Sequence, residues 1–217
     1  MSSAQGSRRY QDMISGEYAG SEEGATKVDP YLVPAFSFPD RVRRLAWNVC
    51  YTLLYRTSPR PLYSWRSFLL RMFGAKMGAN SRFYPKGRVW APWNLTCEEA
   101  ACLGDDAEIY NPAPVFIGSH AIISQQAYIC GATHDYNDPA FPLISFPVSL
   151  GAYSWVCAKA TVMPGVNLGE GAVLGLASVA TRDLEPWSIY AGLPARKVKA
   201  RSHHGSIDGP QSRPDGQ

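Results

Sequence analysis

The sequence has few charged side chains and no long hydrophobic run. Only 18% of its 217 residues are Asp, Glu, Lys or Arg, whereas 46% are hydrophobic, so the chain has enough apolar side chains to fold around a core. No stretch approaches the roughly 18 apolar residues of a membrane-spanning helix, and the first residues, MSSAQGSRRYQDM, have no hydrophobic segment like that of a secretory signal. We therefore expect a cytoplasmic protein, either free or peripheral on the inner face of the cytoplasmic membrane.

Cysteine is also scarce, and its pattern excludes two classes of small domain. The five Cys residues, at positions 50, 97, 102, 130 and 157, form no Cys-x-x-Cys pair, so neither a disulfide framework nor a zinc site is readable. The net charge of +3 is too small to indicate a nucleic-acid partner. We expect no metal and no nucleic acid.

The two ends of the chain differ from its middle. Residues 1–28 and 202–217 are rich in Ser, Gly and polar side chains, which predicts a disordered leader and a disordered tail. Between them, apolar periodicity predicts a helical cap over 40–73, with one helix over 41–56 and a second from about Leu62 to Phe73, before Gly74.

From Met77 onward the sequence repeats with a period of six. Each unit opens with a hydrophobic residue, and Ala, Ser or Thr occupies eleven of the fifteen fifth positions. Random placement would make about seven of the fifteen openers hydrophobic, whereas all of them are. The openers are residues 77, 83, 89, 97, 103, 109, 117, 123, 129, 150, 156, 162, 168, 174 and 180.

A six-residue period indicates a short strand followed by a turn. Three units close one triangular coil, and the coils stack by strand pairing about 4.8 Å apart. The openers group into about five coils of a parallel β-helix, in a domain over 77–201 with a loop over 135–149. An ordinary β-sandwich is the alternative, but it does not require such a regular repeat.

These units, closed by LGEGAVLGLASVATRDLEPWSIYAGLPARKV (168–198), resemble those of the hexapeptide-repeat acyltransferases. The resemblance implies a left-handed parallel β-helix, a homotrimer with each site between two subunits, and acetyl-CoA as co-substrate. The segments 41–78, APWNL (91–95), IYN (109–111) and THDYNDPAFPLI (133–144) narrow the resemblance to the colanic-acid biosynthesis O-acetyltransferase subgroup. That subgroup implies O-acetylation of a sugar, or of a lipid-linked oligosaccharide, in bacterial exopolysaccharide biosynthesis.

Acetyl transfer to a hydroxyl needs a base, and His is the usual one. His203 and His204 lie in the tail, and His120 falls at an outward-facing position, which leaves His134 where the long loop begins. A lone His at such a point is often only a half-buried structural residue. The resemblance places the catalytic His here, and it implies direct attack on the thioester in a ternary complex, without an acyl-enzyme.

Three polar residues near His134 each have two interpretations. Asp135 or Asp138 could orient the imidazole, or both could form turns around Asn137-Asp138-Pro139, which is the interpretation we favour for Asp138. Asn111 could contact the acceptor sugar or form a turn. We carry Asn111 and Asp135 forward as candidate substrate-binding residues.

The resemblance also implies a set of residues that contact coenzyme A. Trp155 would flank the thioester, although it could instead pack at a subunit interface. Arg182 and Arg196 would bind phosphate, although both could be solvated surface charges. The complete set of candidate cofactor-binding residues is Trp155, Ala158, Leu176, Thr181, Arg182 and Arg196.

Four alternative functions are weaker. A covalent route through Cys130 or Cys157 lacks a base placed by the sequence, and a zinc carbonic anhydrase needs three imidazoles where the repeat has two. An acetyltransferase for serine or an amino sugar is less compatible with the THDYNDP loop and the basic helices. A non-catalytic β-helix binding protein would not explain the placed His and Arg residues.

The segment from Arg41 to Cys97 carries eleven basic residues and no Asp or Glu. Aromatic residues lie between them, a combination that is typical of helices lying on anionic lipid. Alternatively, the apolar face of these helices caps the open end of the β-helix and the arginines are solvated. The sequence leaves both interpretations open.

Overall fold

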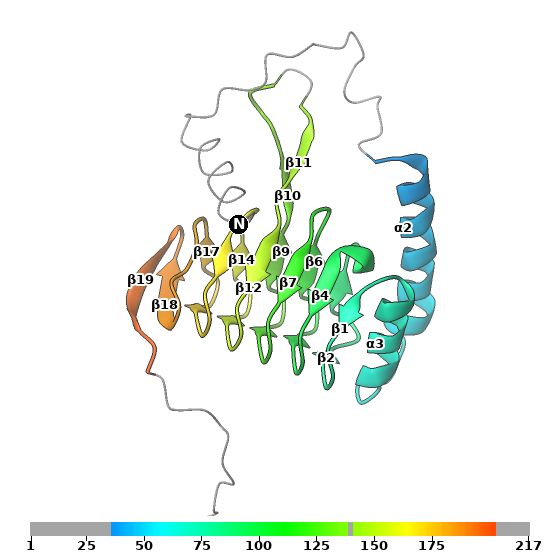
Figure 1. Cartoon of the computed structure of the whole chain (residues 1–217), viewed down its shortest axis with the longest axis horizontal. Helices are drawn as coiled ribbons and strands as arrows, with labels where there is room; N and C mark the ends of the chain where they lie inside the picture. The colour runs from blue at the N-terminus through cyan, green and yellow to red at the C-terminus, as the bar shows by residue number, and fades with distance from the viewer. Residues whose placement is uncertain (1–35, 139–140, 203–217) are drawn as a thin grey trace, which may run out of the picture.

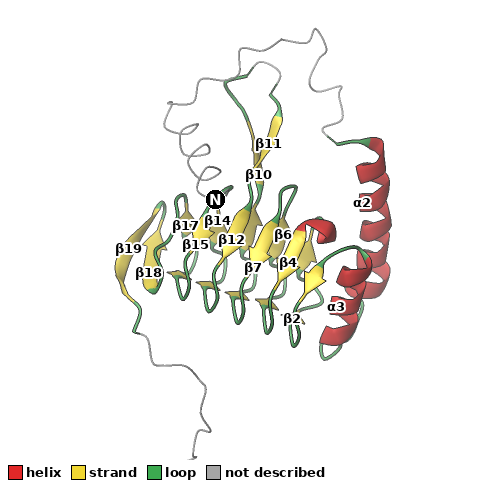
Figure 2. Ribbon diagram, viewed as in Figure 1, coloured by secondary structure: helices red, strands yellow, loops and turns green. Residues whose placement is uncertain are grey.

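The computed structural model describes residues 36–138 and 141–202. Short parallel strands wind into a prism, helices cover one end of it, and one hairpin projects from its side (Figures 1 and 2). The predicted disordered leader and tail lie outside the described residues, apart from Ser202.

The helical segments are α2 (Phe38–Cys50), the π-helical η1 (Tyr51–Tyr55), α3 (Tyr63–Met72) and the 3₁₀ turn η2 (Pro92–Asn94). The strands are β1 (Lys76–Met77), β2 (Arg82–Phe83), β3 (Arg88–Val89), β4 (Leu95–Cys97), β5 (Cys102–Leu103), β6 (Glu108–Tyr110), β7 (Val115–Ile117), β8 (Ile122–Ile123), β9 (Tyr128–Cys130), β10 (Ala132–His134), β11 (Leu143–Ser145), β12 (Val148–Leu150), β13 (Trp155–Val156), β14 (Thr161–Val162), β15 (Asn167–Leu168), β16 (Val173–Leu174), β17 (Val179–Ala180), β18 (Ser188–Gly192) and β19 (Ala195–Ala200).

Three parallel sheets form the sides of the prism, and the register confirms the predicted repeat. Sheet 1 has the order β1-β4-β7-β12-β15, sheet 2 contains β2-β5-β8-β13-β16-β18, and sheet 3 has the order β3-β6-β9-β14-β17. Each predicted opener pairs with the opener of the next coil; Met77, for example, lies opposite Cys97, which lies opposite Ile117. The openers point inward and form one hydrophobic core along the axis.

The turns at the corners of the prism explain the small residue at the fifth position. At most corners the fourth residue of the unit has a positive φ, as His120 does at 59°. This conformation reverses the chain sharply, so the next side chain enters a crowded corner. Ala101, Ala121 and Ala160 at fifth positions have no exposed surface, which is why larger residues are rare there.

The prism has five complete coils, as predicted, and an incomplete sixth. Leu184 bridges to Leu168 of sheet 1, and β18 pairs with β16 of sheet 2. β19 then folds back antiparallel on β18 and covers part of the C-terminal edge.

Two helices close the N-terminal end of the prism, as expected for the 40–73 segment. The side chain of Ser37 accepts a hydrogen bond from the amide of Asp40 and caps α2. Trp47 is buried, and its indole N–H donates to the carbonyl of Val89 at 2.7 Å. This bond fixes α2 to the first coil.

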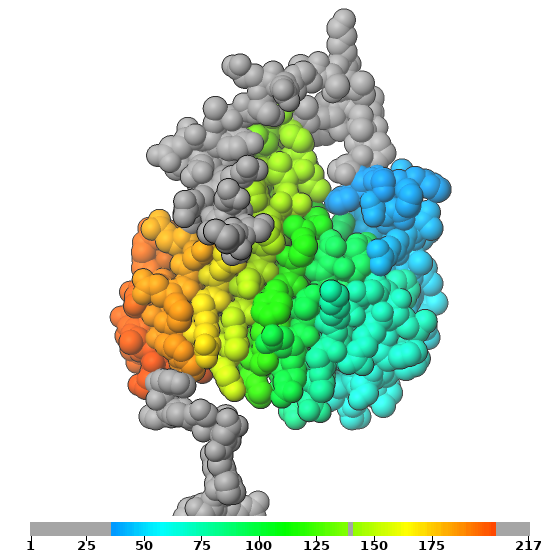
Figure 3. All heavy atoms as spheres, viewed as in Figure 1, coloured from blue at the N-terminus to red at the C-terminus, as the bar shows by residue number. Residues whose placement is uncertain are grey.

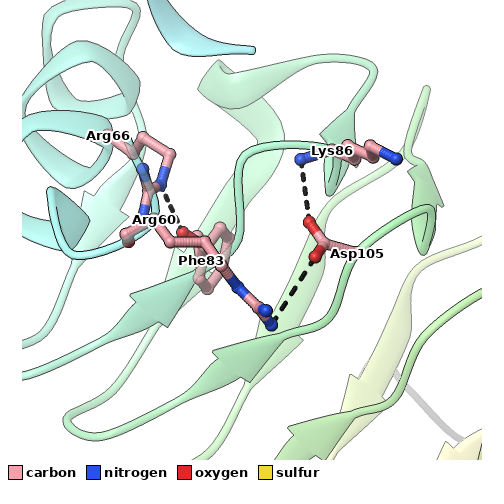
Figure 4. Close-up of polar contacts among 5 residues, drawn as sticks. All are labelled: Arg60, Arg66, Phe83, Lys86 and Asp105. Atoms are coloured by element: carbon pink, nitrogen blue, oxygen red, sulfur yellow. Dashed lines mark hydrogen bonds and ion pairs between the residues drawn. The ribbon is translucent and has the colours of Figure 1, made fainter. Parts of the chain in front are cut away.

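Arg66 of α3 anchors the second helix through a buried guanidinium (Figure 4). Its side chain donates to the carbonyl of Phe83 in β2, to the Ser58 hydroxyl and to the carbonyls of Pro59 and Arg60. All of these acceptors are neutral, and burial lowers the pKa of the guanidinium from its usual value. The expectation that the arginines of this segment are solvated is therefore wrong for Arg66.

None of the described helices is long and apolar enough to cross a lipid bilayer.

Candidate active site

The hairpin β10–β11 interrupts the third coil where sheet 3 turns toward sheet 1, which we call the third corner. At its root, the amide of Gly131 donates to the carbonyl of Tyr110 at 2.7 Å, and the Gly131 carbonyl accepts from Phe146. A Cβ at Gly131 would lie 2.7 Å from the Tyr110 oxygen, so a larger residue would displace the hairpin. The root is therefore fixed to the coil below it.

His134 ends β10 and is half-buried against the returning strand. Its Nδ1 lies 2.9 Å from the carbonyl oxygen of Phe141, and its ring stacks on the Phe141 ring with centroids 4.5 Å apart. A carbonyl oxygen only accepts, so the bond requires the proton on Nδ1. Nε2 then carries the free lone pair, which is the arrangement a general base needs.

Asp135 is buried and forms the hairpin rather than orienting the imidazole. Its carboxylate accepts from the amide of Asn137 at 3.0 Å, and its own amide donates to the carbonyl of Pro142. The carbonyl of Asp138 accepts from the amide of Phe141 at 2.8 Å. These contacts agree with the turn-forming interpretation, and a role for Asp135 in acceptor binding stays a prediction.

Asn111 also lies at the third corner, one coil before the hairpin, and is fully buried. Its Oδ1 accepts from the amide of Ala91 at 2.9 Å, and its Nδ2 donates to the carbonyl of the same residue at 2.8 Å. Both ends of the amide therefore hold adjacent coils together. The geometry favours the turn-forming role, and contact with the acceptor stays a prediction.

A cavity of about 250 Å³ opens at the third corner, where α2 passes the first two coils. The guanidinium of Arg44 lies over the rings of both Phe36 and Trp90, 4.4 and 4.6 Å from their centroids, and these two rings pack on each other. Arg44 Nε is buried and has no hydrogen-bond partner among the described residues. The residues that line the cavity are Phe36, Asp40, Arg43, Arg44, Trp90, Trp93, Asn94 and Pro112.

This cavity lies on the same corner as His134, one or two coils away, which is about 5–10 Å along the axis. Its walls are aromatic and its polar groups are mainly guanidinium and amide. Aromatic rings next to hydrogen-bond donors suit a sugar that carries an acidic group. The sequence contains a signal for this cavity, namely the Arg43-Arg44 pair together with APWNL (91–95). In the sequence analysis these residues serve only to identify the subgroup.

Trp155 lies on the outer face of sheet 2, where it is 42% exposed. Its indole N–H donates to the hydroxyl of Ser124, one coil earlier, at 2.8 Å. The bond fixes one edge of the indole to the preceding coil, so Ser124 is a positioning residue that the sequence alone did not single out.

Ala158 and Leu176 stack at the second corner, between sheets 2 and 3, in consecutive coils. The amide of Ala177 donates to the carbonyl of Ala158 at 3.0 Å, and the Leu176 side chain is 70% exposed. A hollow of about 530 Å³ lies nearer the cap, and its lining includes Ser124 and Gln125 of the same corner. The hollow does not extend to Ala158 or Leu176, which lie on the surface of the later coils.

Thr181 and Arg182 follow the last strand of sheet 3 at the third corner, and Arg196 lies on β19. Both arginines are exposed, and neither forms an ion pair with another described residue. Their charges are available to an anion, as phosphate binding requires.

A single chain separates the two halves of the predicted site. His134 and the cavity lie at the third corner, whereas Ala158 and Leu176 lie at the second, across the width of sheet 3. The structure brings Trp155 close to Ser124 but brings neither His134 nor the cavity to the second corner. Of the other cofactor candidates, Thr181 and Arg182 lie at the third corner, two coils beyond His134.

Two observations on the described residues bear on a covalent route and on a metal site. Burial raises the pKa of the Cys130 thiol and of the Cys157 thiol above their ordinary value, which disfavours the nucleophilic thiolate. No group of three His, Cys, Asp or Glu side chains in the described part of the chain could hold a metal ion.

Comparison with known proteins assigns this arrangement to a family. No family profile matches the chain. The chain is 36% identical over 155 residues to the "Putative colanic acid biosynthesis acetyltransferase WcaF" of Escherichia coli (strain K12), an alignment that covers 71% of this chain and 85% of the relative.

Solved structures share the fold at lower sequence identity. A hexapeptide-repeat acetyltransferase of Vibrio cholerae O1 biovar eltor, complexed with acetyl coenzyme A, matches with a TM-score of 0.69 at 19% identity, over 94% of this chain and all of that one. A galactoside acetyltransferase in complex with coenzyme A matches with a TM-score of 0.68 at 20% identity, over 89% of this chain and 91% of that one. By its close relative, its repeat and its fold, the chain belongs to the hexapeptide-repeat acetyltransferases, in the group that includes WcaF.

Proposed function

We propose that this acetyltransferase moves an acetyl group from acetyl-CoA to a sugar hydroxyl of an exopolysaccharide unit or of its lipid-linked precursor. One observation carries the proposal: the Phe141 carbonyl holds the proton on Nδ1 of His134 and leaves Nε2 free to act as a base. The WcaF likeness supports the acceptor class, and the fold shared with acetyl-CoA and CoA complexes supports the co-substrate.

In the proposed mechanism, both substrates bind before the reaction begins. Nε2 of His134 takes the proton of the acceptor hydroxyl while its oxygen attacks the thioester carbonyl. The new C–O bond forms, the C–S bond then breaks, and the imidazolium returns the proton to the departing thiolate of CoA. No acyl-enzyme forms, in agreement with the raised pKa of the half-buried Cys130 and Cys157 thiols.

The site is assembled from two subunits of a homotrimer. One copy supplies His134 and the third-corner cavity for the acceptor, and its neighbour supplies Trp155, Ala158 and Leu176 for the pantetheine arm. Arg182 and Arg196 bind the phosphates. Because acetyl-CoA is a cytoplasmic metabolite, we place the reaction in the cytoplasm.

The test is a thiol-release assay with acetyl-CoA and a panel of nucleotide-linked and lipid-linked sugars. We expect His134→Ala to lower kcat by about 10²–10⁴, the usual contribution of a general base. His120→Ala is the matched control, because His120 is an exposed histidine of the same coil that stacks on Tyr153. Unchanged turnover in His134→Ala would remove His134 from this role.

The acceptor half of the proposal has its own test. Arg44→Met removes the guanidinium from the cavity but keeps an apolar side chain next to the two rings. We expect the KM for an acidic sugar acceptor to rise about tenfold, since a charge-assisted hydrogen bond is lost, while the KM for acetyl-CoA stays unchanged. A change in the KM for acetyl-CoA alone would contradict this placement of the acceptor.

A further inference from the structure

The outer face of α2 and η1 carries a stripe of apolar side chains that nothing in the described chain covers. Phe38 is 72% exposed, Leu45 64% and Leu53 63%, and Val42 and Val49 lie between them. The spacing of three or four residues puts all five on one side of a continuous helical segment. The opposite side, with Trp47 and Arg44, packs on the prism.

A second stripe, on α3, continues the first. Leu62, Trp65, Phe68 and Met72 are exposed, while Leu69 and Leu70 on the other side are buried against the prism. The two stripes adjoin, because the Trp65 indole N–H donates to the carbonyl of Leu54 at 3.2 Å. We call this surface the apolar cap face; it comprises Phe38, Val42, Leu45, Val49, Leu53, Leu54, Leu62, Trp65, Phe68 and Met72.

Exposed hydrophobic side chains are concentrated on the apolar cap face. Ten of the nineteen exposed large hydrophobic side chains in the described residues lie between Phe38 and Met72. These helices form one end of the molecule, shown in blue to cyan in Figure 3. Single exposed hydrophobic residues are ordinary on soluble proteins, whereas a contiguous group of this kind marks an interaction surface.

The charge around the apolar cap face is mainly positive. Asp40, in the first turn of α2, is the one acidic residue of the helical cap; no Asp or Glu follows it from Arg41 to Cys97, and Arg41, Arg56 and Arg71 are exposed. Among the described residues, the only ion pair of the cap is that of Arg60 with Asp105, at 3.7 Å. The partner of this face must therefore accept apolar side chains and positive charge together.

An anionic bilayer meets both requirements, whereas a second copy does not. Two copies joined symmetrically through this face would bring the same arginines together, with Asp40 as the one carboxylate of the cap to pair them. Apolar and aromatic side chains flanked by arginine are the composition of helices that lie in the headgroup region of a membrane.

We propose that the apolar cap face binds the surface of an anionic bilayer and thereby presents the third-corner cavity to a lipid-linked sugar. This inference rests on the proposed function for its substrate. The link is α2 itself, which carries the apolar stripe on its outer side and contributes Asp40, Arg43 and Arg44 to the cavity. A sugar held at the headgroups by its lipid then lies beside the acceptor site.

The test is flotation of the full chain with vesicles of phosphatidylcholine, alone or mixed equally with phosphatidylglycerol. We expect binding to the mixed vesicles, weakened by salt because the arginines contribute. Leu45→Ser/Leu53→Ser should lower this binding at least tenfold, since two leucines lose their apolar burial. The matched control is Leu193→Ser/Val198→Ser, two exposed apolar residues at the other end of the prism, which should bind like the wild type.

Two outcomes would overturn the proposal: no binding of the wild type to mixed vesicles, or equal binding by Leu45→Ser/Leu53→Ser. A change in molar mass of that variant by light scattering, with vesicle binding intact, would assign the face to a second copy instead. Arg41→Glu/Arg56→Glu tests the contribution of the arginines separately, because this variant leaves the apolar residues in place. It should also reduce binding to the mixed vesicles.

Activity separates this proposal from the proposed function. Leu45→Ser/Leu53→Ser should keep wild-type rates on a soluble sugar acceptor and lose rate only on a lipid-linked acceptor in vesicles. If the wild type binds vesicles but acetylates no acceptor, the proposed function is wrong and the membrane-binding proposal is supported. If the wild type acetylates an acceptor but never binds vesicles, the membrane-binding proposal is wrong and the proposed function is supported.

Discussion

The imidazole of His134 lies nearly parallel to the phenyl ring of Phe141, with an angle of 8° between the planes, and the carbonyl of the same Phe141 faces its Nδ1. Phe141 therefore makes two contacts with the imidazole: its ring stacks on the face, and its carbonyl bonds Nδ1 at the edge. The carbonyl belongs to the backbone, so a substitution can remove the stacking ring and leave the hydrogen bond in place.

Phe141→Leu tests the stacking. We expect kcat to fall about 10- to 100-fold while both KM values stay within about twofold, because the imidazole keeps its tautomer but loses its fixed orientation. Steady-state thiol release measures all three constants. Phe141→Tyr keeps the ring and should retain wild-type kcat; an equal loss in both variants would show that stacking is not what positions His134.

Ser124→Ala tests the positioning of Trp155. The variant removes the acceptor of the indole hydrogen bond and leaves the indole itself, so the KM for acetyl-CoA should rise about two- to tenfold, the value of one hydrogen bond. The acceptor KM should not change. Ser119→Ala is the control, since Ser119 is in the same coil and its hydroxyl bonds Glu98 at a different corner. If both serine variants behave alike, Trp155 does not depend on Ser124.

The period-six pattern predicted the core because each opener pairs with the opener of the next coil. The stacking of the coils fixes this pairing. Met77, Cys97 and Ile117 pair in the register that counting by coils gives, with two extra residues per coil absorbed at the third corner. The break in the period after His134 likewise indicated an insertion over 135–149, and the structure begins its hairpin slightly earlier, with β10 at Ala132. Local repetition determines these features, so the sequence contains them.

The contacts that define the site were not predictable, because they join residues far apart in sequence. The amide bonds of Asn111 go to Ala91, twenty residues away, and the cavity combines α2 with Trp90 and Trp93 of the first coil. Neither interpretation of the basic segment predicts that Arg66 is buried, because its acceptor Phe83 lies seventeen residues further on. No pattern within one unit encodes such pairs.

Arg66→Met tests whether the buried guanidinium holds the cap on the prism. The substitution leaves the Phe83 carbonyl and its neighbours without a donor, so we expect the free energy of unfolding to fall by about 3 kcal/mol. Urea denaturation measures the change. Arg56→Met, at an exposed position on η1's C-terminal side, should alter stability by less than about 0.5 kcal/mol. An equally small change in the free energy of unfolding for Arg66→Met would show that packing alone holds α3 on the prism.

The buried thiol of Cys97 should make the folded protein less stable at alkaline pH. Burial in the core raises the pKa of its thiol above the ordinary 9.0, so the folded chain keeps a proton that the unfolded chain loses. The stability contributed by the protonated thiol is complete below pH 9.0 and is lost as pH rises above it, by up to about 1.4 kcal/mol per pH unit. Cys97→Val has no ionisable group and should lose less stability than the wild type between about pH 8.5 and pH 10.5.

Urea denaturation at several pH values, with reductant present, compares the two slopes. Leu103→Val is the matched control for a change of core volume, because Leu103 is a fully buried opener of the same coil that does not titrate. This control should lose about 1 kcal/mol at every pH and keep the wild-type slope. Parallel slopes for Cys97→Val and the wild type would mean that the thiol stays protonated in both states, or that the core admits the thiolate, and either result would contradict the burial argument.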